Sequence, residues 1–390
     1  VKARIEEFNS LAGYELIHLG LTSRDVTDNV EIYQIKQSLE IIRFKALALL
    51  SRLAEMSEKY AELAIVGRTH NVPAQITTLG KRFSTWGEEM LFSFSHLEEF
   101  INRLPLRGIK GAIGTSSDQI ELLGEGFANL DSALKREWGF EGALISPAQI
   151  YPRSIDFEFV SVLAQLAAAP SNLATNVRLM SGLGLVSEGS SEGQVGSSAM
   201  PHKVNPRLSE RINSLFIILK GFVSMASEIS GEQWNEGDVS CSAVRRVILP
   251  ESSFVMDGIL DTTIQVIDGL QIFQSEISDE VDRELPLLST SHLLMLAVKS
   301  GVGREEAHTS IKKHVRQYRE KKTEKSTSSF FERVFSDPSL KLDRQGVTDV
   351  IGSPLALAGN AAIQARELAR QINSLAGVSN SRSYQPMVWS

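Results

Sequence analysis

The sequence predicts an all-α protein, built as a bundle of long helices with an oligomeric helical core. Between residues 74 and 104, apolar side chains recur at alternating steps of three and four, which is helical periodicity held for about eight turns. Four other long stretches carry the same pattern, and strand signals are sparse. These features favour a bundle over a sheet-based fold.

The five long helices are expected, in chain order, over residues 29–60, 74–104, 156–188, 207–229 and 249–273. Pro170 interrupts the third pattern and predicts a kink or a break there. Residues 63–67 are the best strand candidate. Helices near 30 residues measure about 45 Å, which is longer than a small bundle requires, so we expect packing against other subunits.

The two ends of the chain differ from the centre. Residues 1–13 read as the middle of a helix that lacks an N-cap, and Val1 is not a methionine, so we expect a truncated or processed start. Shorter helices are expected over 276–314, and a Pro-, Gly- and Ser-rich tail follows Asp337. We therefore divide the chain into a remnant of an N-terminal helical domain (1–20), a central bundle domain (21–285) and a C-terminal helical domain with a tail (286–390).

Composition narrows the possible functions. Across 390 residues, Lys and Arg total 40 against 47 Asp and Glu, for a formal charge of -7, so no broad basic surface is available for a nucleic acid. A single cysteine, Cys241, excludes an intrachain disulfide framework and a multi-cysteine metal cluster. We expect a cytoplasmic protein with no membrane or nucleic-acid partner, since no apolar run approaches the roughly 20 residues that span a bilayer.

Polar clusters occupy the segments that join the long helices. The first holds His18, Thr22, Ser23 and Asp25; the second holds Arg68, Thr69 and His70; the third runs over 191–206; the fourth holds Ser242, Arg245 and Arg246. Each has a simple structural interpretation: a helix cap, a hydrogen-bonded turn histidine, a flexible loop, or a solvated arginine pair. Four such clusters at helix ends instead predict a polar pocket on a rigid frame.

Metal and cofactor sites find little support. His308 and His314 are six residues apart and do not share a helix face, and neither a zinc-protease nor an EF-hand spacing occurs. The glycines near Gly182 follow a helix rather than a strand, unlike a dinucleotide-binding loop. We expect no metal and no cofactor, with the chemistry supplied by side chains and substrate.

The segment GSSAMPHKVNP resembles the signature loop of the fumarase/aspartase superfamily. HLGLTSRD and GRTHNVPAQITTLGK are similar to the adenylosuccinate lyase branch, and QIYPRSIDF and GDVSCSAVRRVILPE are also family-like, so the resemblance covers nearly the whole chain. It implies a C–N lyase that releases fumarate from adenylosuccinate, giving AMP, and from SAICAR, giving AICAR. It further implies a homotetramer in which each active site gathers clusters from three subunits.

The resemblance also implies residue roles. Ser197 is the base that removes a proton beside the substrate carboxylate, and His70 is the general acid at the departing nitrogen. The remaining family positions bind the nucleotide and succinyl parts of the substrate: His18, Thr22, Ser23, Thr69, Gln149, Lys203, Asn205, Arg211, Ser242 and Arg246. A serine hydroxyl is a weak base, so it needs activation, for which Lys203 is the nearest cation in sequence.

The sequence differs from the family pattern at two places, and two alternative functions remain open. Family members commonly carry an arginine where Gly237 stands, so one substrate-binding cation is missing or supplied elsewhere. A further family histidine would fall just before Val1. The rivals are another lyase of the superfamily, such as argininosuccinate lyase, or a non-catalytic superfamily scaffold; His202 and Val204 differ from the argininosuccinate lyase loop.

Overall fold

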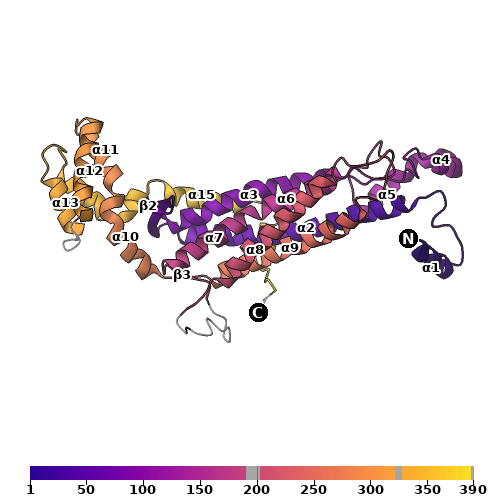
Figure 1. The fold of residues 1–390 in the computed structure, drawn as a ribbon, viewed down its shortest axis with the longest axis horizontal. Helices are drawn as coiled ribbons and strands as arrows, with labels where there is room; N and C mark the ends of the chain where they lie inside the picture. Colours follow the sequence, from indigo (N-terminus) through magenta and orange to yellow (C-terminus); the bar gives the residue numbers. More distant parts are fainter. Residues whose placement is uncertain (190–199, 201–202, 321–326, 388–390) are drawn as a thin grey trace.

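A computed structural model describes residues 1–189, 200, 203–320 and 327–387. The molecule is an elongated helical bundle (Figure 1). Its body consists of α2 (Ser23–Lys59), α3 (Leu79–Arg103), α6 (Ser154–Leu166), α7 (Ala168–Gly182), α8 (Arg207–Glu228) and α9 (Ser242–Gly269). The predicted all-α bundle is confirmed in the described part of the chain. No helix there is long and apolar enough to cross a membrane.

Short elements occupy the two ends of the bundle (Figure 1). One end carries α1 (Lys2–Ala12), α4 (Ser117–Leu123), the 3-10 helix η1 (Gly124–Asn129) and α5 (Leu130–Trp138). The other carries the hairpin of β1 (Ala64–Thr69) and β2 (Val72–Thr78), followed in space by α10 (Gln274–Leu288), α11 (Thr290–Lys299), α12 (Arg304–Glu320), α13 (Thr327–Phe335), α14 (Arg344–Ile351) and η2 (Pro354–Ala358).

The helical periodicity predicted the packing of α3. Phe83, Trp86, Met90, Phe94 and Leu97 are all buried and join one apolar core with residues of α2, α6, α7, α8 and α9. These side chains lie on one stripe of the helix because they recur every three or four residues. The same core continues along the full length of the bundle.

Several predicted boundaries were wrong. Residues 74–78 belong to β2, and α3 begins only after Thr78, whose side chain accepts a hydrogen bond from the Lys81 amide at 3.1 Å. The fifth helix starts at Ser242, seven residues before the predicted 249, and ends at Gly269. Pro250 lies inside this helix.

The predicted interruption near Pro170 is confirmed. Helix α6 ends at Leu166 and α7 begins at Ala168, which puts Pro170 in the first turn of α7. A proline is tolerated there because the amide groups of a first turn have no partner within the helix. The predicted strand over 63–67 is also confirmed in kind, as β1. Two-residue strands β3 (Val186–Ser187) and β4 (Gln271–Ile272) pair beside the ends of α7 and α9.

The C-terminal residues fold back onto the bundle. Helix α15 (Ala361–Asn373) packs against α2 and α3, and α16 (Val378–Ser381) packs against α2. Their buried side chains include Leu368, Ile372 and Val378, which belong to the main core. The segment expected to be a tail after Asp337 therefore contains helices that complete the bundle.

Candidate active site

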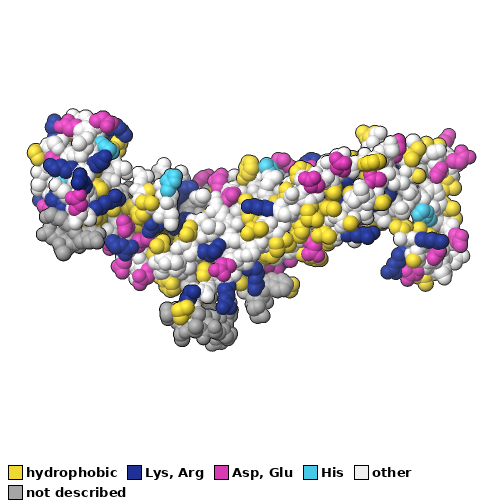
Figure 2. Space-filling model, viewed as in Figure 1, with side chains coloured by type: hydrophobic (Ala, Val, Ile, Leu, Met, Phe, Trp, Pro, Cys, Tyr) yellow, Lys and Arg dark blue, Asp and Glu magenta, His cyan; other side chains and the backbone are white. Residues whose placement is uncertain are grey.

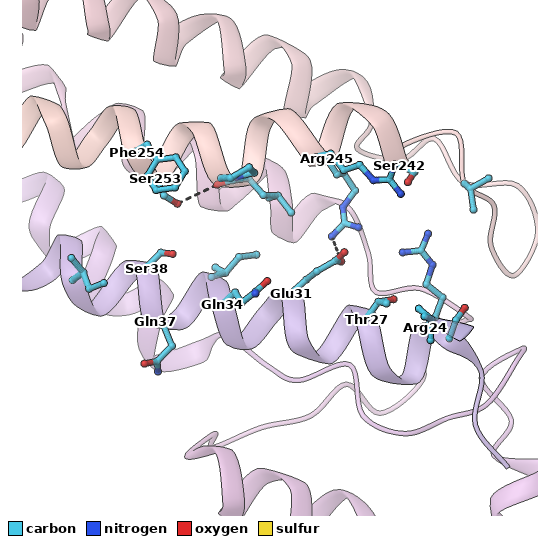
Figure 3. A pocket seen from close by; sticks show the side chains of 18 residues that line it. Arg24, Thr27, Glu31, Gln34, Gln37, Ser38, Ser242, Arg245, Ser253 and Phe254 are labelled. Carbon is cyan, nitrogen blue, oxygen red and sulfur yellow. Dashed lines mark hydrogen bonds and ion pairs between the residues drawn. The ribbon is translucent and has the colours of Figure 1, made fainter. Parts of the chain in front are cut away.

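A groove of about 820 Å³ runs between the N-terminal halves of α2 and α9 (Figure 3). The end at Ser23 and Ser242 is polar, and apolar side chains such as Ile41 and Phe254 line the other end. The lining side chains that matter below are Ser23, Arg24, Glu31, Ser242, Arg245 and Arg246. Figure 3 shows Arg24 on α2 extending toward α9, on the side where Ser242 begins that helix.

Local sequence sets the two helix starts at this groove. Thr22 is the N-cap of α2, and its backbone amide donates to the carboxylate of Asp25 at 2.8 Å, one half of a capping box. Ser242 is the first residue of α9 and follows the buried Cys241. Two helix N-termini therefore open onto one groove, and their partial positive charge favours an anionic ligand.

Arg245 of α9 forms ion pairs with α6 and α2 through the buried Asp156 and the partly exposed Glu31. Nε of Arg245 donates to Asp156 at 2.6 Å, and its Nη2 donates to Glu31 at 2.8 Å and also to the hydroxyl of Tyr151. The Tyr151 hydroxyl donates in turn to Asp156 at 2.6 Å. Complete burial and the neighbouring Asp156 raise the pKa of Tyr151 well above its usual value, so this hydroxyl stays protonated.

The two neighbouring arginines of α9 have different roles. Burial opposes the charge on Arg245, but Tyr151, Asp156 and Glu31 more than offset it and raise the pKa of Arg245. Arg245 is therefore a structural cation and not part of a solvated pair. Arg246 is exposed and lines the groove, and it forms no ion pair within the described residues.

His18 lies beside this groove. It lines a second hollow of about 550 Å³ together with Leu21, Thr22, Ser23 and Asp118. Ser23 lines both hollows, so the two are adjacent.

Gln149 lies near Gly237, and its backbone amide donates to the Glu236 carbonyl at 2.8 Å. A Cβ at position 237 would lie 3.1 Å from Cβ of Gln149 and 3.2 Å from its Oε1. The Gln149 side chain thus occupies the space that a side chain at 237 would need.

The second predicted cluster lies on the β1–β2 hairpin, at the opposite end of the bundle. Thr69 ends β1, and His70 and Asn71 form the turn with φ of 51° and 61°. Two successive positive φ values are typical of the type I′ turn that closes a two-residue hairpin. Thr69 and His70 are exposed, so no residue in the described part of the chain covers the turn.

Two features fix this hairpin to its surroundings. The register shifts between Gly67 and Arg68, and a Cβ at Gly67 would lie 2.7 Å from the Gln75 carbonyl oxygen, so only glycine fits there. Arg68 forms an ion pair with Glu280 of α10, whose carboxylate is buried. The hairpin is thereby attached to α10.

The third cluster lies where α8 begins. Lys203 and Arg211 are exposed, and Asn205 is partly buried just before the helix. The buried Glu188 accepts hydrogen bonds from the amides of Leu208 at 3.0 Å and Ser209 at 2.7 Å, which caps the helix from a distant segment. Ser197, the predicted base, lies outside the described residues.

The structure brings some of the predicted site residues together and keeps others apart. Ser23, Ser242 and Arg246 meet at the groove, with His18 and Thr22 in the adjoining hollow. Thr69 and His70 lie beyond the other end of α2, whose 37 residues measure about 55 Å at ~1.5 Å per residue. The sequence analysis missed Arg24 and Glu31 as lining residues. Arg24 directly follows Ser23, and Glu31 falls on the same helix face two turns later, so both positions could have been found from the sequence.

The chain is similar to known lyases in sequence. Residues 2–218 match a family described as lyase. The chain is 34% identical over 317 residues to the adenylosuccinate lyase of Saccharomyces cerevisiae, covering 80% of this chain and 66% of that relative. It is 32% identical over 327 residues to the adenylosuccinate lyase of Schizosaccharomyces pombe, covering 83% and 68%. The chain thus spans about two thirds of the length of these curated relatives.

The fold has close counterparts among solved structures. The crystal structure of 3-carboxy-cis,cis-muconate lactonizing enzyme from Pseudomonas putida superimposes with a TM-score of 0.79, covering 96% of this chain and 86% of that one. The two sequences are 20% identical, so this likeness establishes the fold alone.

Proposed function

Because this chain belongs to the adenylosuccinate lyase family of the fumarase/aspartase superfamily, we propose that it releases fumarate from adenylosuccinate, giving AMP, and from SAICAR, giving AICAR. The observation that supports this most is the groove between α2 and α9. It gathers Ser23, Ser242 and Arg246 beside two helix N-termini, an arrangement suited to a substrate that carries a phosphate and carboxylates.

The proposed reaction is a β-elimination. Ser197 removes the proton from the carbon next to a substrate carboxylate, and Lys203 and Asn205 stabilise the negative charge that develops on that carboxylate. The electron pair of the broken C–H bond forms the new double bond as the C–N bond breaks. His70 donates a proton to the departing nitrogen, so the products are fumarate and a neutral amine. No cofactor takes part in this scheme.

The active site requires more than one chain. In one subunit, Thr69 and His70 lie beyond the far end of α2, about 55 Å along that helix from the Ser23 end of the groove, whereas proton transfer needs hydrogen-bond contact. We propose a homotetramer in which one subunit contributes the groove, a second the hairpin and a third the loop before α8. Clusters from three copies then form each site.

Exposed apolar side chains on the bundle support this assembly. Ile41 of α2, Ile217 of α8 and Phe254 of α9 are 57%, 70% and 69% exposed. Figure 2 shows apolar side chains along the length of the bundle. A surface of this kind marks a protein contact, and long helices from neighbouring subunits would cover it.

The proposal also covers the cellular compartment and the division of the chain into domains. We place the enzyme in the cytoplasm, with no nucleic-acid or membrane partner. The division into a remnant N-terminal segment (1–20), a central bundle domain (21–285) and a C-terminal domain (286–390) is kept, with α15 and α16 packing on the bundle.

The test is fumarate release, followed by ultraviolet absorbance, from adenylosuccinate and then from argininosuccinate. We expect release from the first substrate alone. Release from argininosuccinate alone would assign the chain to a different lyase, and no release from either substrate would favour a non-catalytic scaffold.

A further inference from the structure

Arg24 is a groove residue with unused hydrogen-bond donors. In the described part of the chain it makes one side-chain hydrogen bond, from Nη1 to Asp28 at 3.1 Å. Its side chain is 14% exposed and lines the groove. Figure 3 shows the guanidinium group reaching from α2 into the space below Ser242. The remaining donors of this planar group are available to a ligand in the groove.

The charge on Arg24 is only partly neutralised. Asp28 is fully buried and also pairs with Arg153 at 3.4 Å, so two guanidinium groups share one carboxylate. Arg153 is itself buried, so it cannot reach a ligand. The excess positive charge of this trio is therefore presented to the groove by Arg24.

The position of Arg24 in its helix is unfavourable for a cation. It is the second residue of α2. The partial positive charge at a helix N-terminus destabilises a cation there, by about 0.3–1 kcal/mol at exposed sites. Helix stability alone therefore does not explain an arginine at this position, whereas a bound anion would.

Gly237 supplies a second, independent observation. Position 237 carries no side chain of its own, and Cβ of Gln149 lies 3.1 Å from a Cβ built on Gly237. The segment containing Gln149 is also linked to Arg24, because the amide of Tyr151 donates to Asp28 at 3.1 Å. Gly237 has no side chain and so provides no cation, whereas Arg24 is connected to the neighbouring segment through Asp28.

We propose that Arg24 binds the phosphate of the substrate nucleotide and makes the enzyme selective for phosphorylated over unphosphorylated nucleosides. The inference deepens the proposed function and rests on it. A phosphate monoester suits this position because it carries nearly two charges and accepts the planar, two-pronged hydrogen bonding of a guanidinium group. Arg246, from the facing helix, would contact the same group.

The test compares AMP with adenosine on the complete protein. Calorimetry gives the Kd of each ligand for the wild type and for Arg24→Gln. A hydrogen bond to a charged group contributes about 1.5–3 kcal/mol, so AMP should bind roughly 10- to 100-fold more weakly to the variant. Adenosine, which lacks the phosphate, should bind with unchanged affinity. Arg24→Lys should recover part of the loss because it keeps the charge but not the planar geometry.

Arg43→Gln is the matched control. Arg43 lies on the same helix and pairs with one carboxylate, Glu98, but it does not line the groove. Its removal should leave both Kd values unchanged. Thermal unfolding of Arg24→Gln should occur within a few degrees of the wild type, since Asp28 keeps its bonds to Arg153 and Tyr151.

The outcomes separate this inference from the proposed function. A wild type that neither binds AMP nor releases fumarate would overturn the proposed function. A wild type that does both, with an Arg24→Gln variant of unchanged preference for AMP over adenosine, would overturn the role of Arg24 alone. Weaker inhibition by fumarate, with AMP binding intact, would mean that Arg24 binds a carboxylate instead and would equally reject the proposal.

Discussion

The two ends of the bundle hold their polar residues in opposite ways. At the groove, buried carboxylates such as Asp156 fix Arg245 between α2 and α9 before any ligand arrives. At the hairpin, Thr69 and His70 are exposed on a turn whose only described ion-pair anchor is Arg68 with Glu280. The groove is organised within one chain, whereas the hairpin presents exposed polar residues that the proposed assembly would bring to another chain.

This difference suggests a division of labour. A binding site benefits from rigid, preorganised charges, because less conformational entropy is lost when the ligand binds. Under the proposed mechanism, the general acid has to reach a substrate held in another subunit, and an exposed turn suits that task. Variants at the two ends should therefore change different kinetic parameters.

The largest expected effect on activity is that of His70→Ala. Loss of a general acid should lower kcat by about 10² to 10⁴, while substrate binding in the groove persists. His18→Ala should act mainly on KM, because His18 lies in the hollow next to the groove. Steady-state fumarate release measures both. Val72→Ala, at an exposed position just after the turn, is the control and should behave as the wild type. A reversed pattern would exchange the two histidine roles.

Mixed assemblies give the next largest effect. His70→Ala and Arg246→Ala are each expected to be nearly inactive alone, but they damage opposite ends of the chain. Co-expressed subunits that assemble at random should recover about a quarter of wild-type activity, since a site can then draw an intact hairpin from one subunit and an intact groove from another. The measurement is activity of the mixed assemblies against each single variant. Failure to recover activity would mean that one chain supplies both residues, which would reject the shared-site proposal.

Sequence periodicity predicted the bundle well and its boundaries less well. The burial of Phe83, Trp86 and Met90 follows from spacing alone. Ile76 fits the same spacing but lies in β2, because a short apolar alternation does not distinguish a strand from the start of a helix. The return of α15 was missed because its apolar residues follow a segment rich in turn formers.

The candidate site was predictable in composition but not in arrangement. Ser23, Ser242 and Arg246 are visible in sequence as polar residues at helix starts, and the groove gathers them. Their separation from His70 depends on the full length of α2, whose start was predicted six residues too late, at 29 instead of Ser23. Arg24 was missed because its importance depends on Asp28 and Arg153, and the chain brings Arg153 near only through tertiary packing.

The smallest expected effect comes from removing the ion pair that attaches the hairpin to α10 while His70 is kept. Arg68→Met would break the ion pair to Glu280, but Arg82 lies close enough to interact with the same carboxylate. Burial, with repulsion from Arg68, lowers the pKa of Arg82 to about 10, although Glu280 opposes that shift. Removing Arg68 relieves this repulsion and leaves Glu280 a cationic neighbour. The free energy of unfolding should therefore fall by no more than about 1.5–3 kcal/mol, the contribution of one charged hydrogen bond.

The kinetic consequence of Arg68→Met should be selective. The hairpin would lose its bond to α10, so His70 would be less well positioned and kcat should fall by up to about tenfold, with KM nearly unchanged. Arg366→Met, which removes an exposed pair with Glu62, is the control for losing an arginine and should change neither parameter. Kinetics and denaturant unfolding on both variants provide the comparison. A loss of kcat as large as that of His70→Ala would mean that Arg68 contacts the substrate directly, and the attachment of the hairpin to α10 would then not be its main role.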